Sequence, residues 1–265
     1  MALIRDEAVV LGRVDYSETS QVLVLFTREH GKVRTIAKGI KRGTKARFAV
    51  GVDLLDVGHV VLSSRHERSE TLAILTEWKQ SRSLWGLREK LFRIQAGQYV
   101  AEVTAQLTED WDPHAELFDA LVMTLAALTA ASEPLDAATA YQLALLESIG
   151  SLPRFDACVL CGREEDLTHF SSFEGGLICR HCEPGQVEKR EISAATVKVL
   201  QKSLSAEAHC SQSSGTPPSD DRRSQSSGTR AGAFTVLNYH ISHLMGREPT
   251  LGAVLVPKSV QRIVE

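Results

Sequence analysis

Four cysteines in two closely spaced pairs constrain this chain more than any other feature of its sequence. Cys158 and Cys161 form the first CxxC pair, and Cys179 and Cys182 form the second pair after seventeen intervening residues. Two such pairs can bring four thiolate sulfurs onto one ion in a tetrahedral arrangement, which is a common ligand set of structural zinc. The spacing therefore predicts a structural Zn²⁺ site at Cys158, Cys161, Cys179 and Cys182.

Other uses of paired cysteines fit this sequence less well. A catalytic zinc keeps one position open for water, whereas four sulfurs close the coordination sphere. The nucleobase deaminase pattern places Pro directly before a CxxC pair, but Ala157 and Ile178 stand there. A thioredoxin-like redox motif needs one pair in a βαβ setting. We expect His169 and His181 to be surface histidines rather than metal ligands.

Cysteine usage and hydropathy indicate an intracellular protein. At 265 residues the chain is long enough for more than one domain. Only Cys210 stands outside the paired motif, in a polar tract, and this is not the pattern of a disulfide framework. No basic segment followed by an apolar one begins the chain, and no apolar run approaches about 18 residues. We therefore expect a cytoplasmic protein without a secretory signal or a membrane span.

Short apolar segments separated by turns occupy the first 80 residues. Each segment is rich in β-branched residues and lacks helical spacing, as is typical of strands; the segments are residues 8–14, 21–27, 32–39, 52–62 and 71–75. Five short strands joined by turns suggest a small barrel. A five-stranded Greek-key barrel of the OB type fits the length and the strand count, and an SH3-like barrel remains an alternative.

Residues 28–48 carry an unusual excess of positive charge. This stretch contains eight Lys and Arg side chains against one acid: Arg28, Lys32, Arg34, Lys38, Lys41, Arg42, Lys45 and Arg47, with Glu29 the single acid. The overall charge of −3 hides the asymmetry, because residues 81–150 hold ten acids and only four Lys and Arg. A basic edge on a β module favours binding to backbone phosphates, with strong salt sensitivity and modest sequence preference.

The rest of the chain is expected to be mainly helical. Apolar residues recur with helical period through residues 84–107 and in segments that begin near Pro113, Asp136 and Ser193. Residues 211–216 repeat identically as residues 224–229, so residues 205–231 are expected to be a disordered insertion. The motifs GxxxxGK[ST], HExxH and GxSxG are absent, which favours a binding protein over an enzyme.

These elements predict an α+β fold with four parts. An OB-fold DNA-binding domain is expected at residues 1–80, and a zinc-binding module at residues 158–187. A helical domain is expected in two pieces around that module, at residues 81–157 and 188–265.

The order of these parts resembles the bacterial recombination mediator RecO family. The stretches that carry the resemblance are Leu25-Phe26-Thr27, Ile36-Ala37-Lys38-Gly39 with the following Ile40-Lys41-Arg42, Ile149-Gly150 with Pro153, and Cys158-x-x-Cys161-Gly162. They are spread over most of the chain. The low-complexity tract at residues 205–231 departs from the family pattern.

The resemblance implies a recombination mediator rather than an enzyme. Such a protein binds single- and double-stranded DNA, anneals complementary strands, and with RecR and RecF helps to load RecA onto DNA coated by single-strand-binding protein. The C-terminal tail of the single-strand-binding protein would dock on it, and it would be associated with the nucleoid. By the family pattern, Lys38, Lys41 and Arg42 would lie on the DNA-binding face, and the charge count adds Arg34, Lys45 and Arg47.

Two other classes of protein stay open at this point. A zinc-ribbon regulator would bind duplex DNA at a preferred sequence. A zinc hydrolase or nuclease would need an open metal position, and Glu164, Glu165 and Asp166 are the acids close to the cysteines in sequence.

Overall fold

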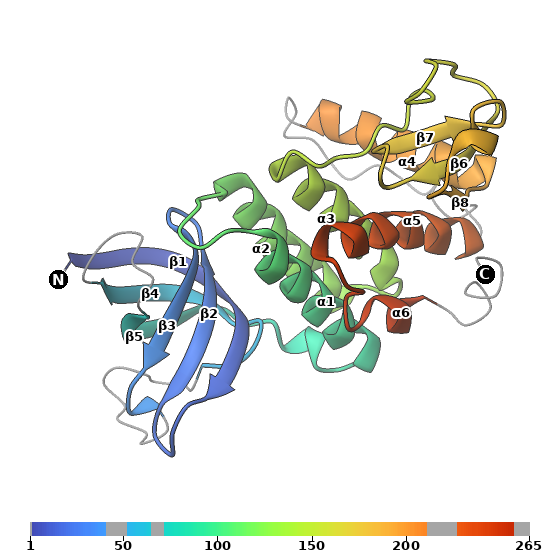
Figure 1. The fold of residues 1–265 in the computed structure, drawn as a ribbon. Helices are drawn as coiled ribbons and strands as arrows, with labels where there is room; N and C mark the ends of the chain where they lie inside the picture. Colours follow the sequence, from blue (N-terminus) through green and yellow to red (C-terminus); the bar gives the residue numbers. More distant parts are fainter. Residues whose placement is uncertain (1, 41–51, 65–71, 211–226, 257–265) are drawn as a thin grey trace. The chain divides into compact units, whose positions relative to one another are not determined.

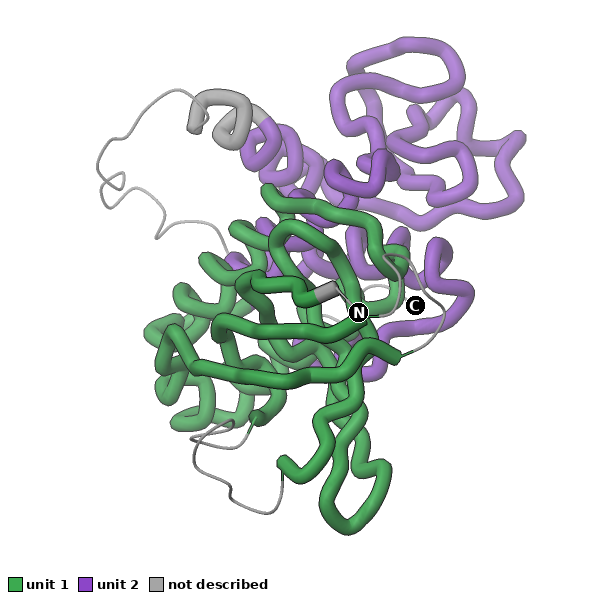
Figure 2. The backbone as a smooth tube through the Cα atoms, turned by 90° about the vertical axis from the view of Figure 1, so that its left-hand side faces the viewer, with its two compact units in different colours: residues 1–134 green, residues 135–265 purple. Residues whose placement is uncertain are grey.

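The computed structural model describes residues 2–40, 52–64, 72–210 and 227–256, which Figure 1 draws as a ribbon. The chain forms two compact units, Met1–Pro134 and Leu135–Glu265, which Figure 2 distinguishes. The first contains a five-stranded barrel and two long helices, and the second contains further helices and a small sheet. The expected α+β fold is confirmed. The finer division at residues 80, 157 and 187 stays a prediction.

Five strands of unit 1 close into a barrel: β1 (Ala2–Asp15), β2 (Gln21–Thr27), β3 (Gly31–Ala37), β4 (Val57–Ser64) and β5 (Ala73–Arg82). Their order is β1-β2-β3-β5-β4, and β3 and β5 are the one parallel pair among the described strands. Alternation along β2 buries Leu23 and Leu25 in the barrel interior, while Val22 and Val24 face outward. This topology is that of the OB type rather than the SH3-like alternative.

The open part of the β3 edge is covered by a segment that follows the first long helix. β3 pairs with β5 only at Thr35 and Ile36. Nearer the start of β3, Lys32 forms a parallel bridge with Asp110, and the Trp111 N–H donates to the Lys32 carbonyl at 2.8 Å. Gly31 has a φ of +69°, and a Cβ there would lie 1.9 Å from the backbone oxygen of the residue after Trp111. Only glycine therefore permits this close cover.

Two helices and a short 3-10 turn follow the barrel in the described part of unit 1: η2 (Trp85–Leu87), α1 (Leu91–Leu107) and α2 (Ala115–Ala130). Phe26 points outward from β2 and packs on Phe118 of α2, with ring centroids 6.3 Å apart. The buried Arg93 side chain donates to the carbonyls of Ala131 at 2.9 Å and Thr129 at 2.5 Å. These carbonyls lack partners within the helix, so Arg93 caps the C-terminus of α2.

Unit 2 combines helices with a three-stranded sheet. Its helices are α3 (Pro134–Ser148), α4 (Ala194–Cys210), α5 (Ser227–Met245), α6 (Gly252–Leu255) and the short η3 (Glu183–Gly185). The sheet has the order β7-β6-β8, with β6 (Leu167–Ser171), β7 (Gly176–Cys179) and β8 (Arg190–Glu191). No helix in the described part of the chain is long and apolar enough to cross a membrane.

The tract expected to be disordered, residues 205–231, is helical at both of its ends. α4 continues to Cys210 and α5 begins at Ser227, so residues 205–210 and 227–231 are helical. The sequence Ala206-Glu207-Ala208 consists of strong helix formers, which explains the extension of α4. At the start of α5, the expected Cβ position of Gly232 lies 2.6 Å from the Thr196 hydroxyl, so α5 packs closely on α4 there. Residues 211–226 lie outside the described part of the chain.

Candidate metal centre and nucleic-acid interface

The four paired cysteines converge in unit 2. Their sulfur atoms all lie within 4.8 Å of one another, and the Cys161 and Cys179 sulfurs are 3.7 Å apart. A disulfide would require about 2.05 Å. Bonds of about 2.3 Å from four sulfurs to a tetrahedral zinc ion place neighbouring sulfurs about 3.8 Å apart. The donor set and its spacing therefore fit a metal ion with tetrahedral preference.

Local backbone geometry holds both CxxC pairs in place. In the first pair, the Gly162 N–H donates to the Cys158 carbonyl at 2.8 Å, with a Gly162 φ of +74°. In the second pair, the Cys182 N–H donates to the Cys179 carbonyl at 3.0 Å. Cys179 ends β7, whose pairing with β6 fixes its position. Glycine is favoured after the first pair because residues that carry a Cβ atom rarely adopt a positive φ.

The thiols differ in acidity because their surroundings differ. Burial raises the pKa of the Cys158 thiol, but backbone N–H groups of Cys179, Leu160 and Cys161 together lower it to about 6. The pKa of Cys182 rises to about 12, first because of its hydrogen bond with Cys161 and then because of burial and the other two sulfurs. A bound cation would favour the thiolate form of all four, so metal binding should release protons.

Histidines and acids near the cysteines stand apart from this cluster. Among the described residues, the metal-binding group contains the four cysteines and no His, Asp or Glu. The His169 Nδ1 atom lies 3.0 Å from the Thr168 hydroxyl. The Asp166 backbone carbonyl accepts a hydrogen bond from the Arg180 N–H. The arrangement offers a closed sulfur site, as expected for a structural metal.

Two cations of the basic run at residues 28–48, Arg28 and Lys32, are bound by groups of unit 1 itself. The ammonium of the buried Lys32 donates to the Ala105 carbonyl at 2.7 Å and the Thr108 carbonyl at 2.5 Å, at the C-terminus of α1. Arg28 forms a two-pronged ion pair with Asp119 of α2. These cations were counted in the charge excess, but they hold the helices on the barrel.

Two of the six expected DNA-binding side chains lie on the described part of β3 and the turn after it. The Arg34 side chain is 62% exposed, and its guanidinium lies 3.1 Å from the Asp110 carboxylate. Lys38 is exposed and forms no ion pair within the described residues. The other four, Lys41, Arg42, Lys45 and Arg47, lie outside the described residues. The assignment of all six to DNA binding stays a prediction.

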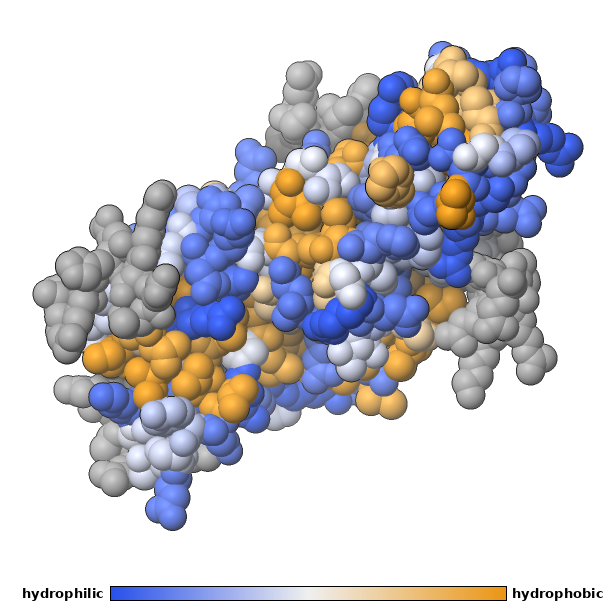
Figure 3. Space-filling view, viewed as in Figure 1, coloured by the Kyte–Doolittle hydropathy of each residue, from blue (hydrophilic) through white to orange (hydrophobic). Residues whose placement is uncertain are grey.

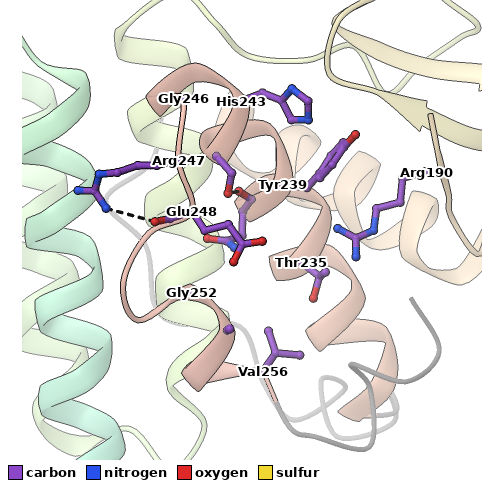
Figure 4. Close-up of a pocket in the computed structure, with 12 residues that line it drawn as sticks. Arg190, Thr235, Tyr239, His243, Gly246, Arg247, Glu248, Gly252 and Val256 are labelled. Carbon is purple, nitrogen blue, oxygen red and sulfur yellow. Dashed lines mark hydrogen bonds between the residues drawn. The ribbon is translucent and has the colours of Figure 1, made fainter. Parts of the chain in front are cut away.

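A cavity in unit 2 was not anticipated from the sequence. It has a volume of about 700 Å³ and is lined by β8, α5 and α6 (Figure 4). Arg190 lies over the Tyr239 ring at 5.1 Å from its centroid, and Arg247 donates to the Glu248 carbonyl. Burial, and then the hydrogen bond to Glu188, raise the pKa of Tyr239 to about 12. No sequence motif marked this cavity, because its lining comes from two separate stretches of the chain.

Fold and site together define an OB-type barrel protein with helices and a four-cysteine cluster that can hold a metal ion. The profile described as "Recombination protein O N terminal" matches residues 1–84, and the one described as "Recombination protein O C terminal" matches residues 88–221. The chain therefore belongs to the RecO family of DNA repair proteins.

Individual relatives agree with the family profiles. Three relatives, each called DNA repair protein RecO, share 31–34% identity with this chain. The protein from Rhodopirellula baltica is 34% identical over 68% of this chain and 67% of its own length. The protein from Anaeromyxobacter sp. strain Fw109-5 is 33% identical over 82% and 85%, and that from Bacillus pumilus is 31% identical over 75% and 76%.

Proposed function

We propose that this protein is a recombination mediator in DNA repair. It binds single- and double-stranded DNA, anneals complementary strands, and with RecR and RecF helps to load RecA onto DNA coated by single-strand-binding protein. The observation that carries the proposal is the pair of RecO profiles, which together match residues 1–84 and 88–221. The OB-type barrel supports it, because this fold commonly binds oligonucleotides.

The proposed mechanism is electrostatic and needs no nucleotide hydrolysis. Cations on and after β3, with Arg34 and Lys38 on the described part, neutralise the phosphates of two strands and lower their mutual repulsion. Counterion release drives this contact, so the affinity falls steeply with salt. Docking of the C-terminal tail of the single-strand-binding protein brings the mediator to coated DNA. This activity would place the protein in the cytoplasm, at the nucleoid.

We propose that the metal is Zn²⁺, held by Cys158, Cys161, Cys179 and Cys182. When bound, the ion would supply a structural crosslink between the two CxxC turns and would take no part in a reaction. Because Cys179 ends β7 and the Val159 N–H donates to the Leu177 carbonyl, a shared ion would tie the first CxxC turn to the β6–β7 hairpin.

The decisive experiment measures annealing of two complementary oligonucleotides that are coated with single-strand-binding protein, without ATP, across a salt series. Acceleration that fades as salt rises is expected. The variant Lys41→Glu/Arg42→Glu should weaken binding to many sequences and reduce the salt slope by about 0.7 per lost contact on single strands. Lys198→Glu/Lys202→Glu, at two exposed positions of α4, makes the same change in net charge and is the matched control, which should change neither quantity.

Two outcomes would contradict the proposal. Unchanged affinity of the charge-reversal variant at low salt would remove the basic run from DNA binding. A footprint at one preferred duplex sequence, with no annealing by folded and metal-loaded protein, would favour the zinc-ribbon regulator instead.

A further inference from the structure

Trp85, in the short turn between the barrel and α1, is the most exposed tryptophan of the chain. Its side chain is 73% exposed, whereas Leu84 and Leu87 in the same turn are buried. Leu91, at the start of α1, is also 72% exposed. Tryptophan is highly buried on average in folded proteins, because its ring offers a large apolar area. A tryptophan that the fold leaves in solvent is therefore a candidate contact residue.

The backbone that carries Trp85 is held in place by the helices of unit 1. The Arg88 N–H donates to the Trp85 carbonyl at 2.9 Å, which closes the η2 turn. The Gly86 carbonyl accepts a hydrogen bond from the Arg93 guanidinium at 3.2 Å. A Cβ on Gly86 would lie 2.5 Å from the Thr129 carbonyl oxygen, so η2 packs closely on the end of α2. None of these contacts uses the indole ring, which a fixed backbone therefore presents to solvent.

Positive charge borders Trp85 on both sides. Arg82, at the end of β5, and Lys90, just before α1, are exposed and form no ion pair within the described residues. The one acid between them, Glu89, pairs with Arg93 at 3.4 Å. No acidic side chain in the first turn of α1 offsets the positive end of its helix dipole. This part of the molecule therefore attracts an anionic partner.

We define the Trp85 surface as the exposed side chains of Arg82, Trp85, Lys90 and Leu91. Trp85 and Lys90 are five residues apart, so their Cα atoms lie within about 17 Å, and the η2 turn shortens this span. Around the segment between β5 and α1, hydrophilic and apolar side chains are interspersed on the face turned to the viewer (Figure 3). The surface thus combines one aromatic ring with cations, rather than forming a broad apolar patch.

We propose that the Trp85 surface binds single-stranded DNA, with a base stacked on the Trp85 ring and phosphates at Arg82 and Lys90. The inference rests on the proposed function and adds a second DNA site to it, because annealing brings two strands together. This site is separate from the cations on and after β3. β3 pairs with β5 at Ile74, eight residues before Arg82, which is roughly 25 Å along a strand.

The chemistry of the surface favours single strands over duplex and over a protein partner. Every base has a π face, so stacking on an exposed aromatic ring tolerates any sequence. In a duplex the bases are already stacked on one another, and only the phosphate contacts remain. A specific protein interface buries about 800 Å² on each partner, around a centre that is depleted of charges. Here exposed cations stand beside the two apolar side chains.

The first test measures quenching of tryptophan fluorescence by an oligothymidylate of about 30 nucleotides, long enough to reach both sites. Trp78 is buried, so bases cannot stack on it. We expect the oligothymidylate to quench the wild-type protein and a hairpin duplex of similar charge to leave its emission unchanged. Trp85→Phe should lose most of the quenching, which assigns the signal to Trp85.

The second test measures affinity by fluorescence anisotropy of labelled DNA, together with annealing. Trp85→Ala should lower single-strand affinity at least about fivefold, slow annealing, and leave duplex affinity within about twofold. Trp85→Phe keeps a ring and should retain most of the affinity. Phe173→Ala removes another ring that is 85% exposed, in the turn between β6 and β7, and is the matched control that should bind normally.

The outcomes separate this inference from the function on which it rests. If wild-type protein accelerates annealing but its Trp85 is not quenched and Trp85→Ala binds normally, the Trp85 surface does not bind bases and the proposed function stands. If wild-type protein binds neither form of DNA, both fail.

Two further results would overturn the inference alone. Equal losses for single strands and duplex in Trp85→Ala would assign the ring to structure. A concentration-dependent dimer that Trp85→Ala abolishes while its DNA affinity is normal, measured by sedimentation, would assign the surface to a second copy of the chain. If Trp85→Ala does not fold, the quenching comparison with Trp85→Phe still decides.

Discussion

Lys32 provides the sharpest test of how the barrel is held to its helices. Lys32→Met keeps the apolar stem of the side chain and removes the ammonium. That ammonium donates to the carbonyls of Ala105 and Thr108 and lies 3.3 Å from the Asp110 carboxylate. The substitution therefore leaves two carbonyls at the end of α1 without their charged donor, in a place from which water is largely excluded.

The magnitude follows from these contacts. Each hydrogen bond to a charged group contributes about 1.5–3 kcal/mol, and a cation at a helix C-terminus adds about 0.3–1 kcal/mol. Contributions within one cluster are not additive, and removing the ammonium also removes the cost of desolvating it. We expect a net loss of about 2–3 kcal/mol in the free energy of unfolding of unit 1.

Urea unfolding followed by tryptophan fluorescence measures this loss directly. All three tryptophans, Trp78, Trp85 and Trp111, belong to unit 1, so their fluorescence reports that unit alone. With an m-value of about 2 kcal/mol/M, the midpoint should fall by about 1–1.5 M. Lys38→Met is the exposed control near the same strand, and it should change the free energy of unfolding by less than about 0.5 kcal/mol. Equal midpoints for the two variants would refute this account of Lys32.

Three other perturbations have definite expected outcomes. Arg93→Met should destabilise unit 1 by about 3 kcal/mol in the same fluorescence assay, because the carbonyls of Thr129 and Ala131 at the end of α2 lose their buried charged donor; a change below about 1 kcal/mol would contradict the capping role. Cys158→Ser, or treatment with a chelator, should abolish bound metal measured by elemental analysis and lower the thermal midpoint of unit 2, whereas Cys210→Ser should retain the metal. Burial lowers the pKa of His240; the unfolded state therefore takes up its proton first, and stability should fall as the pH drops below about 6.5. In circular dichroism melts, the thermal midpoint of His240→Gln should fall less on acidification than that of the wild-type protein. Identical pH profiles for the two proteins would rule out this contribution of His240.

The cysteine cluster could be predicted from the sequence because its geometry is local. Each CxxC pair is one turn, and the seventeen residues between Cys161 and Cys179 are enough for one hairpin. The strands and the helices were also visible as periodic patterns. The end of α4 was not, because its last turn lies inside a tract whose composition favoured disorder.

The structural roles of Arg28 and Lys32 could not be predicted, because the groups that bind them are distant in sequence. Arg28 meets Asp119 across 91 positions, and Lys32 meets the Thr108 carbonyl across 76. A count of charges along the chain cannot distinguish a cation that faces solvent from one that fastens a helix.

The segment that covers the β3 edge has a consequence for biosynthesis. Asp110 and Trp111 leave the ribosome some thirty residues after the end of β5. At translation rates of about 5–20 residues per second, the nascent barrel spends roughly 2–6 s with its β3 edge unpaired. During that interval the edge can pair with strands of other nascent chains. The nascent barrel is therefore open to edge-to-edge pairing until α1 and the residues after it have emerged.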